Sequence, residues 1–185
     1  MARAIVAAAW CGLAALALAG CARSDGGTNQ PVAGSFEIRA MSAEASVADL
    51  PAGAECAQTP LALDESGWVC DDATSTGYLV EPAALTAADV ATVDAGPNGQ
   101  PGSTTWGVRV TLTATGAKTF EELTAQATQA APPANKVVML VDGEVVLAPQ
   151  VMESITGGEL SIPLKGGEAE AKAMAVTILG TVGVQ

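Results

Sequence analysis

Alternating apolar and polar residues predict several strands in this chain. The clearest alternation covers residues 106–113, where the apolar side chains would all face one side of a strand and the polar ones the other. Residues 36–41 and 159–162 alternate in the same way, and residues 77–82 form a short run that is also expected to be a strand.

Two β-branched runs predict a tight β-hairpin. They cover residues 137–141 and 145–147, and Asp142-Gly143 lies between them. A type I′ turn needs a positive φ at both central residues, so Asp-Gly between apolar runs is a strong hairpin signal. Gly157-Gly158 predicts a further turn before the strand at 159–162.

Helical periodicity predicts two longer helices. Residues 116–130 carry apolar side chains three and four positions apart, and Thr115 is expected to cap this helix. Residues 168–180 carry a broad apolar face suited to lying on a sheet.

A third helix is predicted by a capping box. Thr86 and Asp89 have the required spacing, and the helix is expected to run from about Ala87 to near Ala95. The order strand, helix, strand, helix, hairpin, strand, helix predicts an α+β two-layer sandwich. Its sheet is expected to be mixed or antiparallel, with about three helices.

The N-terminus predicts the compartment. A short positive start is followed by an apolar stretch, residues 4–18, that is shorter than the roughly 20 residues a bilayer-spanning helix needs. The stretch ends in LAGC, which is similar to the bacterial lipobox, and its last residue is Cys21. This resemblance implies that residues 1–20 are removed and that Cys21 becomes the acylated first residue. An ordinary secretory signal with a chance cysteine is the alternative.

Three parts of the chain are therefore expected. Residues 1–20 are a lipoprotein signal peptide, residues 21–35 a Gly/Ser/Asn/Pro-rich flexible tether, and residues 36–185 one α+β domain. Two or three acyl chains anchor a protein stably. We expect the protein to be lipid-anchored on the extracytoplasmic face of the bacterial cell membrane.

Cys56 and Cys70 are the two cysteines that come after Cys21. Two thiols in an oxidising compartment are expected to form a disulfide, and closing a loop of about 15 residues contributes about 3 kcal/mol in the chain-entropy model. A redox-active or metal-binding pair is the alternative. It is disfavoured because the spacing is far from Cys-x-x-Cys and no histidine is present to complete a zinc site.

The composition of the chain argues against several classes of function. The chain has 185 residues, a formal net charge of −12 and no histidine. The missing histidine excludes Ser-His-Asp and Cys-His catalysis, and the acidic charge disfavours nucleic-acid binding. We expect no enzyme activity, no catalytic residue, no metal ion, no cofactor and no nucleic-acid partner. The adjacent Asp71 and Asp72 are interpreted as solvated charges rather than a catalytic pair.

Three stretches in order carry a family resemblance. The cysteine pair is followed by Tyr78-Leu79, Pro82 and Asp89-Val90, then by WGVRVTLTATGAKTFEELT from Trp106, then by VMLVDGEVVLAPQVMESITGGELSI from Val138. Together they resemble the head subdomain of the first periplasmic domain of SecD, in the SecDF protein-export family. The sequence has no counterpart of the transmembrane helices that drive export in SecD, so motor activity is not expected.

The resemblance implies a binding role. We expect a lipid-anchored extracytoplasmic protein, accessory to Sec-dependent export, that contacts unfolded polypeptide or the translocon. Strand addition at an exposed sheet edge, or an apolar groove, would serve this role. The alternative is a lipoprotein that reuses the fold to bind another envelope protein or a ligand.

Overall fold

The computed structural model describes residues 35–98 and 105–180, which form two antiparallel sheets and two α-helices. The predicted signal peptide, Cys21 and nearly all of the predicted tether lie outside these residues. Within the described residues, none of the helices combines the length and the apolar character needed to cross a bilayer.

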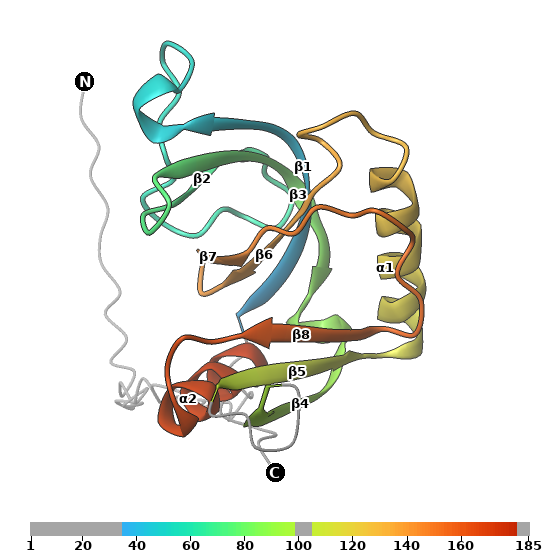
Figure 1. Cartoon of the computed structure of the whole chain (residues 1–185). Helices are drawn as coiled ribbons and strands as arrows, with labels where there is room; N and C mark the ends of the chain where they lie inside the picture. The colour runs from blue at the N-terminus through green and yellow to red at the C-terminus, as the bar shows by residue number, and fades with distance from the viewer. Residues whose placement is uncertain (1–34, 99–104, 181–185) are drawn as a thin grey trace, which may run out of the picture. The chain divides into compact units, whose positions relative to one another are not determined.

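The larger sheet has five strands in the order β2-β3-β1-β6-β7 (Figure 1). Every neighbouring pair in it is antiparallel. The predicted hairpin at Asp142-Gly143 is confirmed, since both residues have positive φ, 54° and 78°. The strands are β1 (Phe36–Ser46), β2 (Gly67–Asp71), β3 (Thr76–Thr86), β6 (Val137–Val141) and β7 (Glu144–Leu147).

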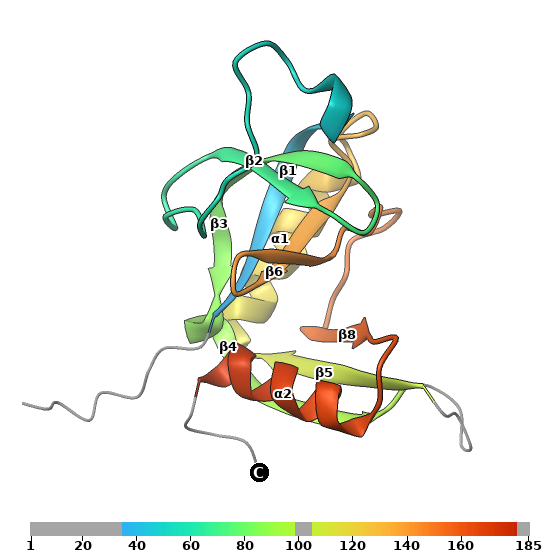
Figure 2. The same cartoon turned by 90° about the vertical axis from the view of Figure 1, so that its left-hand side faces the viewer.

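The smaller sheet has three antiparallel strands, β4 (Val90–Pro97), β5 (Trp106–Leu112) and β8 (Glu159–Pro163), in the order β4-β5-β8. Helix α2 (Glu168–Leu179) lies along β4 and β5 (Figure 2). Helix α1 (Ala114–Ala127) contacts β3 and β5 and so links the two sheets.

One hydrophobic core is shared by both sheets and both helices. Both faces of the larger sheet are covered, because a second apolar cluster lies on its other side. All five residues of β6 are buried, as expected for an unbroken apolar run in a strand covered on both faces. The shared core includes Phe36, Leu85, Val110, Phe120, Met139, Ile162 and Ile178. The second cluster comprises Met41, Val69, Tyr78, Val80, Val138 and Leu140.

The predicted α+β class is confirmed, and the predicted third helix is wrong. The capping box of Thr86 and Asp89 is present, with the Thr86 N–H donating to Asp89 Oδ2 at 2.9 Å. It begins only a 3₁₀ turn, Ala87–Asp89, and the chain then enters β4. Residues from Val90 onward pair with β5, and this pairing buries Val90 and Val93 in the shared core. Sheet pairing therefore outweighs the local helix signal.

The sheet type agrees with the prediction of a mixed or antiparallel sheet, whereas one helix start needs a smaller correction. The strands pair only antiparallel in the part of the chain that is described, and the parallel contact there is an isolated bridge between Cys56 and Trp68. Helix α1 is capped by Thr113, whose Oγ1 accepts from the Gly116 N–H at 3.1 Å, rather than by Thr115. The helix at residues 168–180 agrees with α2 to within one residue.

Candidate functional site

The two sheets leave four edge strands, which are β2, β7, β4 and β8. An edge strand presents unpaired N–H and C=O groups, and proteins that must avoid pairing with other chains cover or charge such edges. Three of the four edges here carry such protection.

The outer edge of β2 is covered by the chain itself. The Ala57 N–H donates to the Trp68 carbonyl at 2.8 Å, and Cys56 forms a bridge with Trp68. The edges of β4 and β8 carry charge and proline instead. Asp94 and Pro97 are exposed on β4, and Glu159 and Pro163 are exposed on β8.

The edge of β7 contains no proline and, after its first residue, no charged side chain, and no other strand of the described residues pairs with it. After the exposed Glu144, the strand continues as Val145, Val146 and Leu147, and all three are only partly buried. Val145 packs against the second apolar cluster, whereas Val146 and Leu147 pack against the shared core. Among the described residues β7 pairs with β6 alone. The outer backbone edge of β7 is therefore unpaired, although β2 lies close to part of the strand, and apolar side chains lie on both faces of β7.

A depression of about 490 Å³ lies beside the start of this edge. The larger sheet curls so that its two edge strands, β2 and β7, contact each other without pairing (Figure 1). We call the depression the β2–β7 groove. It is lined by Cys56, Ala57, Gln58, Thr59 and Pro60, by Val69, Cys70 and Asp72, and by Asp142, Gly143 and Glu144.

The groove has acidic walls. Asp72 stands on the β2 side and Asp142 and Glu144 on the side of the β6–β7 turn, and all three are exposed. No lysine or arginine lines the groove, and none of the three carboxylates belongs to an ion pair within the described residues. The groove also has apolar lining, because Ala57 is only partly buried and Pro60 is exposed, whereas Val69, which also lines it, is buried in the second apolar cluster.

The wall formed by residues 56–60 is fixed at both ends. A disulfide joins Cys56 to Cys70 of β2, with the two Cα atoms 5.7 Å apart. At the other end, Pro60 lies against Gly143, because a Cβ added at Gly143 would be 2.8 Å from Pro60 Cγ. The disulfide and this close packing together set the position of the wall.

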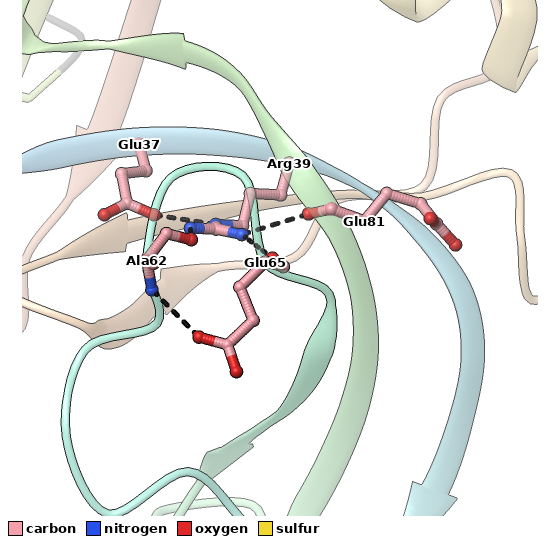
Figure 3. A network of polar contacts seen from close by, with 5 residues as sticks. All are labelled: Glu37, Arg39, Ala62, Glu65 and Glu81. Atoms are coloured by element: carbon pink, nitrogen blue, oxygen red, sulfur yellow. Dashed lines mark hydrogen bonds and ion pairs between the residues drawn. The ribbon is translucent and has the colours of Figure 1, made fainter.

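A buried arginine holds the chain that continues from this wall (Figure 3). Arg39 of β1 is fully buried, and its guanidinium forms an ion pair with Glu37 at 2.6 Å. The same group donates to the carbonyl oxygens of Ala62, Glu65 and Glu81 at 2.9, 2.7 and 3.1 Å. The irregular segment around residues 62–65 is thereby tied to β1 and β3.

Sequence reasoning did not identify Arg39. The alternation in residues 36–41 predicts a strand with one polar, solvated face, yet the irregular segment covers that face and buries Arg39 beside Met41. The available signal was an arginine two residues after Glu37, on the face of the predicted strand that was expected to be polar. The pattern of residues 57–66 does not predict that this segment folds back over the sheet.

The residues singled out from the sequence lie in different surroundings. Cys56 and Cys70 form the disulfide described above, and Cys21 lies outside the described residues. Asp71 is used locally, since its carboxylate accepts from the Ala73 N–H at 2.9 Å and from Thr74 Oγ1 at 2.8 Å in the β2–β3 turn. In the described ranges, no three Asp, Glu or Cys side chains are grouped closely enough to hold a metal ion.

Comparison with known proteins gives a consistent result. The family described as SecDF, P1 head subdomain, matches residues 65–181, a range that includes β2, β7 and the acidic residues of the groove. The SecD subunit of the protein translocase of Streptomyces coelicolor is 31% identical over 98 residues, which is 53% of this chain and 17% of that relative. The chain thus spans about a sixth of the length of SecD.

Two solved structures share the fold. The crystal structure of SecDF in its super-membrane-facing form has a TM-score of 0.51 at 24% identity, covering 78% of this chain and 18% of that one. A structure of SecDF, described as a membrane component that enhances protein export, has a TM-score of 0.51 at 25% identity. That match covers 79% of this chain and 62% of the other.

Proposed function

Because the chain belongs to the SecDF P1 head subdomain family, we propose that it is a polypeptide-binding module of the bacterial cell envelope that assists Sec-dependent protein export. The activity is binding, and catalysis is not part of the proposal. The bound partner is an unfolded secreted chain or a subunit of the translocon.

The observation that carries this proposal is the open edge of β7. An extended polypeptide that adds a strand to this edge forms main-chain hydrogen bonds, which do not depend on its sequence. A protein that meets many different unfolded chains needs this kind of recognition. The partly buried side chains of Val145, Val146 and Leu147 supply apolar contacts on both faces of the added strand.

We propose that Cys21 anchors the module to the extracytoplasmic face of the cell membrane. The support is the lipobox-like sequence that ends at Cys21 after a short apolar stretch. The intact mass of the membrane-extracted protein tests this proposal. Removal of residues 1–20 with two or three acyl chains added is the expected result, and an unmodified N-terminus would rule out the anchor.

In-cell photo-crosslinking tests the binding role. Probes replace the exposed residues Glu144 and Gln150, which flank the open edge, and a control probe replaces the exposed Thr92 on β4. The captured proteins are identified by mass spectrometry. We expect many secreted chains or translocon subunits at the two edge positions and few at Thr92.

Two results would overturn the proposal. Equal capture at all three positions would show that the edge of β7 is not the binding surface. A single recurrent envelope protein, without any translocon peptide, would mean that the fold serves a different partner, and the export role would then be dropped.

A further inference from the structure

We propose that the β2–β7 groove selects polypeptide segments that carry lysine or arginine beside apolar residues. This inference rests on the proposed function, because it names the class of segment that the same surface prefers. Strand addition at β7 supplies affinity without regard to sequence, whereas the groove adds a preference.

The position of the groove couples it to the strand edge. Glu144 is both the first residue of β7 and part of the groove wall. A strand added along β7 therefore extends past Glu144 into the groove, where its side chains meet the residues of both walls. Apolar side chains of the added strand face Val145, and those that enter the groove reach the walls formed by β2 and residues 56–60.

The charge of the groove determines which side chains suit it. Asp72 stands on one wall and Asp142 and Glu144 on the other, and no lysine or arginine among the described residues lines the groove. A lysine or arginine in the bound segment would supply the missing opposite charge, whereas a glutamate would add to the repulsion. Long basic side chains also place their aliphatic stems against apolar surface, here Ala57 and Pro60, while the charged ends remain near the carboxylates.

The three carboxylates of the groove do not form a candidate metal site. Within the described residues, no group of three or more acidic or cysteine side chains is arranged to hold a metal ion. Charges on two walls suit an extended segment with several side chains better than they suit a single small cation.

A second copy of this chain is a poor occupant of the groove. The formal net charge of each chain is −12, so two copies repel one another. A basic segment of another protein is attracted by the same charge, and this attraction also raises its rate of association.

Fluorescence anisotropy with the whole mature protein in detergent tests the inference. The probes are three peptides of alternating valine and polar residues, identical except that the polar residues are Lys, Gln or Glu. The groove variant carries D72N, D142N and E144Q, and the control variant carries D49N, D94N and E153Q, so both change the net charge equally. Asparagine tolerates the positive φ at position 142, so the turn is kept.

We expect the Lys peptide to bind about tenfold more tightly than the Glu peptide in dilute salt. Exposed ion pairs each contribute up to a few-fold, and salt screens them. The preference should disappear in the groove variant, persist in the control variant and shrink as salt is raised.

Each other outcome has a distinct meaning. Equal binding of all three peptides would refute the charge preference and leave strand addition in place. An equal loss in both variants would assign the preference to overall charge and refute a role of the groove. Failure of all three peptides to bind would overturn the proposed function itself. A concentration-dependent dimer that excludes the peptides would make a second copy the occupant and refute the inference.

Discussion

Replacing Arg39 by methionine should destabilise the protein and loosen the groove wall. Methionine keeps most of the side-chain length and its apolar stem but removes every donor. The carbonyl oxygens of Ala62, Glu65 and Glu81 would then lose their partner, and the carboxylate of Glu37 would lose its ion pair.

The expected cost can be worked out from these contacts. A hydrogen bond from a charged donor contributes about 1.5–3 kcal/mol, and breaking a buried ion pair by removing one partner costs about 3–5 kcal/mol. Ala62, Glu65 and Glu81 are themselves exposed, so water can replace part of what their carbonyls lose. We therefore expect R39M to lower the free energy of unfolding by about 3 kcal/mol, near the lower end of the buried-pair range.

Urea unfolding followed by tryptophan fluorescence measures this loss, because Trp68 lies in β2 close to the segment that Arg39 holds. Two control variants show how the loss of stability divides between the charge of Arg39 and its hydrogen bonds. R39K keeps the charge but lacks the planar fork that reaches several carbonyls, so about half of the loss is expected. E37Q removes the partner's charge but keeps an amide oxygen that can accept from Arg39 Nε, so it should cost less than R39M, about 2 kcal/mol. A loss below about 0.5 kcal/mol for R39M would refute the reasoning, since such values are typical of ordinary surface changes.

Three further predictions concern the groove and the edge. C56S/C70S should lower the free energy of unfolding by about 3 kcal/mol, and unchanged thermal unfolding would contradict this. The same variant should weaken the preference for the Lys peptide, because residues 56–60 are no longer tied to β2. G143A should lower stability more than G157A, since both positions have positive φ but only Gly143 would clash with Pro60, and equal melting temperatures would contradict this. V146K should reduce peptide affinity at least about tenfold, because a charge on an edge opposes strand addition. Some stability should also be lost, because Val146 packs against the shared core, so affinity is measured under conditions where the variant is folded; unchanged affinity would exclude β7.

Local signals in the sequence predicted the features that depend on a few neighbouring residues. Asp142-Gly143 specified its hairpin because the turn geometry is decided within two residues. The period-two pattern of β5 and β8 specified which faces are buried because each strand lies on one side of a core. The capping box of Thr86 was also a correct local signal, although the chain continues from its short turn into a strand.

The groove could not be predicted because it depends on contacts between distant segments. Residues 56–60 have no regular pattern, and their position comes from the disulfide and from the packing of Pro60 on Gly143. The burial of Arg39 likewise depends on a segment more than 20 residues away, whose carbonyls it binds. In both cases a segment is positioned by a backbone carbonyl or by a proline ring. The residue types alone do not show that these groups will meet their partners.

The acidic groove also bears on why an open apolar edge is tolerated. Unprotected edges promote pairing between copies of the same protein, and charge beside the edge is one of the ways in which proteins prevent this. Here the charge stands at the start of the edge, at Asp142 and Glu144, while Val145, Val146 and Leu147 remain free of it. Two copies that met edge to edge would bring these carboxylates together, whereas a basic segment would be drawn to them. One arrangement of charge therefore opposes self-association and favours the proposed partner.

On this basis the groove variant with D72N, D142N and E144Q should self-associate more than the control variant of equal charge, and sedimentation velocity at matched concentrations would show it. Identical sedimentation of the two variants would mean that net charge alone keeps the copies apart.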